Sequence, residues 1–378
     1  MVRTFCAAAA VLLGAASPIL ATAADAPSGT EGPGPSEEAP ESAPDHASGR
    51  TWFALPALFW LPETKLGAAA VGGIHFHLHG AEEASSAFLI AGVAIEGQAT
   101  ADLSSDVWLA SGTLLSGRLR VANYPEAFYG IGPDTRVSQR EDLTRRFVEA
   151  TFGGELQVPG LDGRLRAGPR AQGRVEQVRD ATPGGLVATH AVAGASGFSA
   201  LGLGGSVTWD SRDEKLWPTR GAFAQAAYLY YPAAIGRNDG FGRATVEGRE
   251  FLPLGRGRVL GLAALLEQSH GETPFSILAK IGSTRYLRGI REGRYRDNVA
   301  WAAQTELRLP LDHRFAATLF AAVGDVARSL AALEVRTLKV AGGAGLRYRL
   351  TGEGATLRAD VAMAQAGPEV YVLLLEAF

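Results

Sequence analysis

Residues 337–350 read Thr-Leu-Lys-Val-Ala-Gly-Gly-Ala-Gly-Leu-Arg-Tyr-Arg-Leu, and apolar and charged side chains alternate along this stretch. One set of alternate positions holds Leu338, Val340, Ala344, Leu346, Tyr348 and Leu350. The other set holds Lys339, Arg347 and Arg349. Because successive side chains of a strand point to opposite faces, this period of two predicts a strand with one apolar and one charged face.

The same alternation recurs along the chain. In residues 298–310, Thr305, Leu307 and Leu309 oppose Gln304, Glu306 and Arg308. We expect sixteen strands, near residues 52–60, 65–79, 85–95, 98–109, 113–123, 144–157, 163–176, 200–210, 219–232, 240–252, 257–270, 297–310, 314–325, 337–350, 354–365 and 369–378. Several exceed the roughly 5 to 6 residues usual in soluble sheets and match the roughly 9 to 11 residues of a tilted strand that crosses a bilayer.

The connections between these strands alternate in length. Those after even-numbered strands are mostly short, whereas those after odd-numbered strands include the three longest, residues 124–143, 177–199 and 271–296. Long loops outside and tight turns in the periplasm are typical of outer-membrane barrels. The sequence therefore predicts an all-β fold, a transmembrane antiparallel β-barrel of sixteen strands in the bacterial outer membrane.

The N-terminal region has a different composition. Residues 1–23 combine Arg3, an apolar stretch from 5 to 20 and the small residues 21–23, which predicts a secretory signal peptide containing the only cysteine, Cys6. Residues 24–50 are rich in Pro, Glu and Ser and predict a disordered linker before a barrel over residues 51–378. The barrel region is nearly neutral in charge, and we expect no nucleic-acid partner.

Residues 282–297 read Gly-Ser-Thr-Arg-Tyr-Leu-Arg-Gly-Ile-Arg-Glu-Gly-Arg-Tyr-Arg-Asp, with five arginines and three glycines. Gly289 and Gly293 would each cost a helix about 1 kcal/mol relative to Ala, and no apolar face accompanies the arginines. We interpret the stretch as a long, shaped loop between the eleventh and twelfth strands. By residue type alone, a basic surface loop attracted to anionic headgroups or polysaccharide is an equal alternative.

Within this loop, Leu287-Arg288-Gly289-Ile290 resembles the Val-Arg-Gly-Phe/Tyr loop of the BamA/TamA family. The barrels of that family belong to the outer-membrane assembly and secretion superfamily and carry the bacterial surface antigen domain. Further matches, in the family's order, are Phe128-Tyr129-Gly130-Ile131-Gly132, Trp209 to Asp213 followed by Trp217 to Gly221, Glu306 to Leu311, and Tyr371 to Phe378.

The resemblance implies that the arginine loop folds into the barrel lumen and that Arg288 meets acidic side chains on the inner wall. Glu306 is the preferred partner, since alternation turns it to the polar face. The family places a second acid where this chain has Ala322, and Asp325 lies nearby as a substitute. The ending with Tyr371 and Phe378 is expected to act as the C-terminal signal for the assembly machinery.

The resemblance also sets limits on function. Residues 24–50 are too few for a periplasmic substrate-docking domain, so the chain is expected to be a barrel-only member served by a separate periplasmic partner protein. Pro56 and the pair Gly367-Pro368 lie in the two strands that must meet to close the barrel, and proline donates no ladder hydrogen bond. A seam that opens sideways toward lipid is one interpretation, and ordinary strand-end prolines are the other.

Other chemistry is less well supported. His75, His77 and His79 alternate on one expected strand, but neighbours on one face lie roughly 6.5 to 7 Å apart, which suits a polar lining better than a metal site. His190 and His270 have no evident nucleophile partner, and no Gly-x-Ser-x-Gly elbow occurs. We therefore expect no enzyme activity, metal or cofactor.

The function expected from the sequence is translocation or insertion of protein or lipid at the outer membrane. The expected surroundings are outer-membrane lipids and lipopolysaccharide. The alternative is a passive pore or structural surface protein whose loop plugs the channel.

Overall fold

The computed structural model describes residues 50–161, 163–350 and 356–374, and these form an all-β unit. The strands are β1 (Thr51–Leu61), β2 (Lys65–Phe76), β3 (Ser85–Ala94), β4 (Ala99–Trp108), β5 (Leu114–Phe128), β6 (Glu141–Gln157), β7 (Leu165–Arg179), β8 (Phe198–Asp210), β9 (Gly221–Tyr231), β10 (Gly236–Arg237), β11 (Phe241–Gly255), β12 (Arg258–Gly271), β13 (Ala279–Ile281), β14 (Tyr295–Asp297), β15 (Val299–Pro310), β16 (Phe315–Ala327), β17 (Lys339–Arg349), β18 (Thr356–Ala364) and β19 (Gly367–Leu374). The expected signal peptide and most of the expected linker lie outside the described residues.

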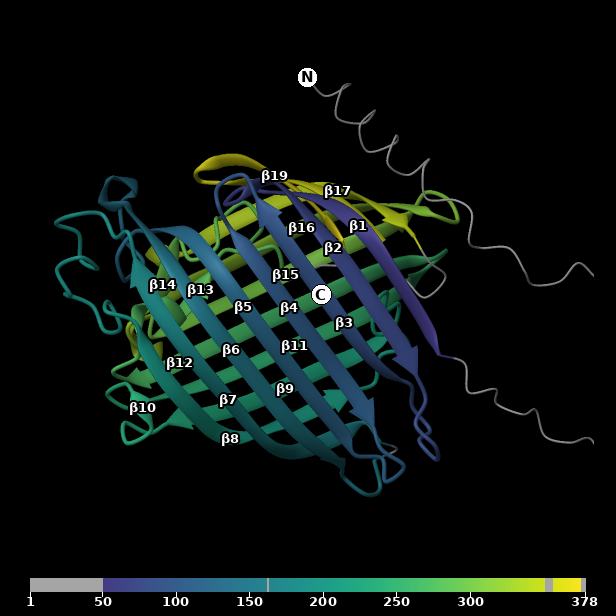
Figure 1. The fold of residues 1–378 in the computed structure, drawn as a ribbon. Helices are drawn as coiled ribbons and strands as arrows, with labels where there is room; N and C mark the ends of the chain where they lie inside the picture. The colour runs from purple at the N-terminus through teal and green to yellow at the C-terminus, as the bar shows by residue number, and fades with distance from the viewer. Residues whose placement is uncertain (1–49, 162, 351–355, 375–378) are drawn as a thin grey trace, which may run out of the picture. The chain divides into compact units, whose positions relative to one another are not determined.

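Each long strand pairs antiparallel with its neighbour along the chain, and β19 returns to pair with β1, so the sheet closes into a barrel (Figure 1). The large sheet has seventeen strands, of which β10 has only two residues, so sixteen strands build the wall. β13 and β14 form a separate two-stranded sheet within the connection 272–298. The predicted sixteen-stranded antiparallel barrel is confirmed.

Alternation along the strands produces an apolar outer face and a polar inner face. On β17, Leu346 is 53% exposed whereas its neighbour Arg347 is buried. On β15, Gln304, Glu306 and Arg308 are buried in the same way. Polar side chains are buried on this face because they pack against one another and against connections, while the apolar face remains for lipid.

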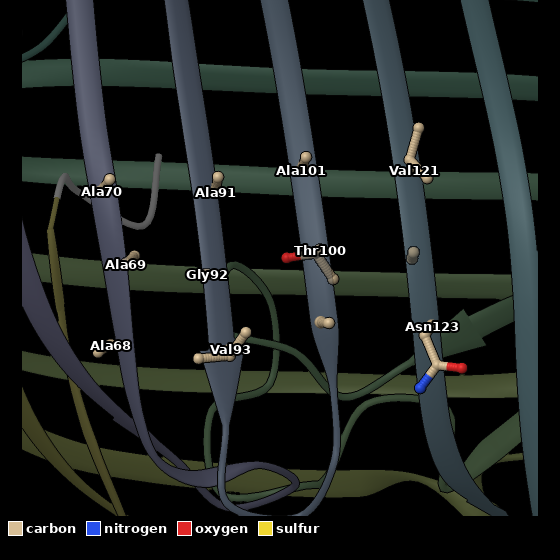
Figure 2. Close-up of a pocket in the computed structure, with 12 residues that line it drawn as sticks. Ala68, Ala69, Ala70, Ala91, Gly92, Val93, Thr100, Ala101, Val121 and Asn123 are labelled. Atoms are coloured by element: carbon tan, nitrogen blue, oxygen red, sulfur yellow. The ribbon is translucent and has the colours of Figure 1, made fainter.

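The outer face of β2–β5 carries many small side chains. Ala70, Ala91, Ala101 and Val121 are successive cross-strand partners and form one row across four strands (Figure 2). Together with the alanines and Asn123 beside them they line a shallow apolar hollow of about 650 Å³. These small side chains lie where the strands are short, since β2, β3 and β4 have 12, 10 and 10 residues against 15 and 17 in β5 and β6.

The described strand limits lie within three residues of the sequence expectations except at the end of β5, which continues five residues further. β5 continues to Phe128 and β6 begins at Glu141, so both extend beyond the predicted limits at 123 and 144. β2 ends at Phe76, so only His75 of the three alternating histidines lies in a strand. The prediction of three histidines on one strand was wrong, because the chain leaves the sheet before His77.

Candidate functional site

The connection 272–298 joins β12 to β15, the eleventh and twelfth strands of the wall, and carries the five arginines. It contains a short 3-10 turn, Phe275–Ile277, followed by β13 and β14. β13 and β14 pair in register, with Lys280 opposite Arg296. The pairing of β13 with β14 therefore holds the two ends of the segment 282–294 together.

Leu287 to Ile290 form a tight turn at the tip of this segment. The N–H of Ile290 donates to the carbonyl of Leu287 at 3.1 Å. Gly289 has φ of 104°, and a Cβ added there would lie 3.2 Å from Cβ of Ala364 on β18. Glycine is required at this position both by the backbone conformation and by the close approach to the wall.

Arg288 projects from the turn and is completely buried, with 0% of its side chain exposed. Its Nη2 donates to Oε2 of Glu306 on β15 at 2.8 Å, and its Nη1 donates to Oδ2 of Asp360 on β18 at 2.8 Å. The guanidinium also lies over the ring of Phe320 on β16, 3.6 Å from the centroid. One side chain thus joins three strands through two charge-assisted hydrogen bonds and a cation–π contact.

Other buried arginines of the wall share these two acids. Arg347 of β17 donates to both Glu306 and Asp360, and Arg308 donates to Glu306 through Nε at 3.2 Å. Because a buried carboxylate needs charged or hydrogen-bonding partners, this arrangement supplies both acids with cationic donors and holds their side chains in place. The wall residues already form a charge network, and Arg288 of the docked loop joins it.

The sequence predicts Glu306 and Asp325 as partners of Arg288. Glu306 makes the ion pair described above. Asp325 on β16 instead accepts a hydrogen bond from the hydroxyl of Thr337, and within the described ranges no ion pair joins it to Arg288. The second acid is Asp360, which is not among the partners predicted from the sequence, although alternation along 354–365 places it on the polar face.

Tyr371 takes part in the same site. Its side chain is buried, and its hydroxyl accepts a hydrogen bond from the N–H of Gly289 at 2.7 Å. The residue assigned from sequence to the C-terminal assembly signal thus contacts the loop turn in the folded protein. Phe378, the other residue of that assignment, lies outside the described residues.

The apolar residues of the turn are buried with Arg288. Leu287 and Ile290 pack in one cluster with Ala302 of β15, Ala322 of β16 and Ala341 of β17. Ala322 stands where related sequences were expected to carry an acid, and here that position contributes apolar packing. Small side chains on the wall leave the room that Leu287 fills.

A second buried arginine attaches the end of the connection to the opposite part of the wall. Arg296 in β14 lies 3.6 Å from Glu126 of β5 and is 2% exposed. Its guanidinium also lies 5.1 Å from the ring centroid of Phe128, which packs against Phe275. Glu126 in turn accepts a hydrogen bond from Arg145 of β6 at 2.6 Å.

The remaining three arginines of the loop reach further parts of the barrel. Arg285 pairs with Glu247 of β11 at 2.9 Å, and Arg291 pairs with Glu369 of β19 at 3.1 Å. Arg294 donates to the hydroxyl of Thr135 at 2.8 Å in the connection after β5. The five arginines therefore contact separate elements rather than forming one exposed basic patch, so the surface-loop alternative does not describe this segment.

Sequence motifs that are far apart in the chain meet around this loop. The amide of Gly132 donates to the carbonyl of Arg296 at 2.9 Å. At the other end of the barrel, the turn between β8 and β9 reaches the network, since Arg308 donates to the carbonyl of Pro218 at 3.1 Å and lies over the ring of Trp217. The network from Trp217 through Arg308 and Glu306 to Arg288 connects the two ends of the barrel.

Other candidate sites from the sequence have different surroundings. In the described part of the chain, no group of three or more His, Cys, Asp or Glu is placed to hold a metal ion. His190 does have a neighbour that the sequence did not reveal, because its Nδ1 lies 3.0 Å from the hydroxyl of Ser196. Both residues are exposed on the connection after β7, where His190 has φ of 57°.

The described residues contain no helix long and apolar enough to cross a membrane. A closed barrel of sixteen strands with an apolar outside and a charged inside is the architecture of a bacterial outer-membrane protein. Residues 150–369 match the Omp85 superfamily domain, which is more than half of the chain. The chain therefore belongs to the Omp85 superfamily.

Solved structures share the fold at low sequence identity. BamA from Haemophilus ducreyi lacking POTRA domains 1–3 is 13% identical with a TM-score of 0.58, over 87% of this chain and 70% of that one. CdiB from Acinetobacter baumannii is 11% identical with a TM-score of 0.53, over 86% of this chain and 59% of that one. Among curated proteins, none is similar enough in sequence to match.

Proposed function

We propose that this protein translocates or inserts protein or lipid at the outer membrane, with the connection 272–298 docked in the barrel lumen. The observation that carries the proposal is Arg288, which is fully buried between Glu306 of β15 and Asp360 of β18. A loop whose tip is held at a fixed depth by one buried charged side chain can obstruct the lumen and still be released when that contact breaks. Membership of the Omp85 superfamily supports this role over that of a simple channel.

Sideways opening at the junction of β1 and β19 would give substrates access to lipid. Trp60 of β1 lies opposite Val372 of β19, and β1 contains Pro56 while β19 begins with Gly367 and Pro368. Proline cannot donate to a sheet ladder, which limits the number of hydrogen bonds that must break. A W60C/V372C disulfide should therefore abolish activity in a proteoliposome assay, and an active locked protein would contradict a moving seam.

A second candidate function is a passive pore. Polar side chains of β3–β7 line a hollow of about 290 Å³, including Ser86, Ser104, Ser116, Arg118 and Gln172. This stretch of wall offers hydrogen-bonding groups along which water and ions can pass. The loop would then be a plug and the barrel a channel.

Planar-bilayer conductance separates these two functions. A translocator with a docked loop should give small, flickering currents that grow when residues 282–296 are replaced by a short Gly-Ser linker. Large and steady currents from the intact protein would instead favour the pore. The control is a Gly-Ser replacement of residues 329–336 in the connection between β16 and β17, where every side chain except half-buried Leu333 is exposed, and it should leave the small currents unchanged.

The partners proposed for this function are outer-membrane lipids and lipopolysaccharide, the assembly machinery for the barrel's own insertion, and a separate periplasmic protein that delivers substrate. Copurification from outer membranes in mild detergent, followed by identification of bound chains and lipids, tests them. Recovery of lipid alone would leave the delivery step without support.

A further inference from the structure

The junction between β1 and β19 is uneven at the end of the barrel that carries the long connections. Trp60 lies opposite Val372, and β1 ends one residue later at Leu61. β19 begins at Gly367, so its residues 367–370 extend beyond the last residue of β1. The short turn 62–64 leads into β2. It lies where further residues of β1 would otherwise have paired with β19.

Two adjacent residues of the arginine loop occupy this place. Arg291 donates from Nε to Oε1 of Glu369 on β19 at 3.1 Å. The next residue, Glu292, donates its backbone N–H to Oε1 of Glu63 in the β1–β2 turn at 2.6 Å. Two consecutive residues of the loop thus contact both sides of the junction.

The charges explain why a bridging residue is needed here. Extending the register from Trp60 and Val372 by three residues places Glu63 opposite Glu369, and like charges in opposed positions destabilise a sheet. Burial raises the pKa of Glu63 above its usual value. Arg291 supplies a positive charge beside these two acids, and the amide of Glu292 gives Glu63 a hydrogen-bond donor.

Glu292 is itself held in place by the hairpin of the loop. Its carboxylate lies 2.7 Å from Nζ of Lys280 on β13, and this cation lowers the pKa of Glu292. The backbone of residues 291–292 is therefore positioned by contacts that do not involve the seam. A preformed element of this kind binds both strand ends without having to order itself first.

We propose that Arg291 and Glu292 form a clasp, which binds Glu369 on one side and Glu63 on the other and keeps the seam closed at this end of the barrel. The clasp goes beyond the translocation function, because it concerns the resting state of the wall and requires no substrate. Two parts of one loop then have different roles. Arg288 anchors the loop, and Arg291 and Glu292 hold the junction of β1 and β19 closed.

Hydrogen–deuterium exchange of the intact protein in detergent or nanodiscs tests the clasp, because the exchange rate of a paired amide follows the local opening equilibrium. In an R291A/E63A variant, amides in peptides covering 58–66 and 366–374 should exchange roughly threefold to thirtyfold faster than in the parent. A W60C/V372C disulfide, placed in a chain whose only natural cysteine is Cys6, should remove the difference.

Arg285→Ala is the matched control. Arg285 is 46% exposed and pairs with Glu247 of β11, whereas Arg291 is 42% exposed and pairs with Glu369. The control should leave seam exchange at the parental rate, and an R291E/E369R swap should restore most of the protection lost in R291E alone. Parental exchange in R291A/E63A, an equal increase in R285A, or no recovery in the swap would each overturn the clasp. Because the readout is structural, it can hold even if no substrate is translocated.

Discussion

Replacing Arg288 with Ala should release the loop turn while leaving the barrel folded. The side chain is 0% exposed and makes ion pairs with Glu306 and Asp360, both at 2.8 Å, as well as a stacking contact with Phe320. Removing one partner of a buried ion pair typically costs about 3 to 5 kcal/mol. We expect the lower value, about 3 kcal/mol, because Arg347 still pairs with both acids in the variant.

That energy acts on the docking equilibrium of the loop. A change of about 3 kcal/mol raises the population of the undocked loop roughly 150-fold. Trypsin reports this population, because Arg285, Arg291 and Arg294 remain available for cleavage in the variant. When opening is fast relative to cleavage, the rate of cutting within 282–297 should rise by the same factor.

Two controls make the measurement specific. Arg285→Ala removes a half-exposed ion pair of a kind worth about 0.2 to 1 kcal/mol, so cleavage should rise only about fivefold or less. Heat-modifiable migration in gels checks that each variant keeps the barrel. Parental resistance in R288A, together with rapid cleavage in R291A, would refute the assignment of Arg288 as the anchor.

Two further predictions concern the turns at either end of the barrel. Gly289→Ala should accelerate tryptic cleavage of the loop roughly fivefold to 150-fold, because a side chain at φ of 104° is strained and its Cβ would lie 3.2 Å from Cβ of Ala364. Gly248→Ala is the neutral control, since no atom lies within 4 Å of the added Cβ. Equal cleavage rates in the two variants would contradict the requirement for glycine at 289. In the β8–β9 turn, burial would raise the pKa of Asp213, but hydrogen bonds from the side chain and amide of Thr219 outweigh it and lower the pKa below 3.8. The stabilisation is therefore present above pH 3.8 and lost as pH falls through the lowered pKa. At pH 7, D213N should lose the protection of the amides of residues 211–220, measured relative to their intrinsic exchange rates, that the parent loses only in acid. Parental protection in D213N would contradict this.

The number and order of the strands could be predicted because a barrel wall repeats one simple pattern. Each strand must present apolar side chains to lipid and polar ones to the interior, so alternation persists along nearly every strand. The missed end of β5 has a specific cause. Asn123 is opposite Ala99, where β4 begins, so residues beyond it have no β4 partner and Pro125 costs no ladder hydrogen bond on that side.

The partners of the loop could be predicted only in part. Glu306 follows from alternation on the strand directly after the loop, where sequence distance is short. Asp360 and Glu369 lie on β18 and β19, and they meet Arg288 and Arg291 only because the closed sheet brings these strands around to the loop. Alternation identifies which acids face inward, but the pairing of each acid with an arginine depends on the register of several strands taken together.

The distribution of the loop contacts limits how the barrel can open. The loop is held on β15, β18 and β19 through Arg288, Gly289 and Arg291, and on β5 through Arg296. Among the described residues, the loop makes a single hydrogen bond with β1–β4 or the turns between them, the one from Glu292 to Glu63. If the clasp opens while the loop stays docked, we therefore expect the short strands β1–β4 to move as a flap between two fixed strands, β5 and β19. Faster amide exchange in R291A/E63A should then extend across β1–β4 and stop at β5, whereas a change that spreads through β6 and β7 would mean that the loop itself has lost its contacts with the wall.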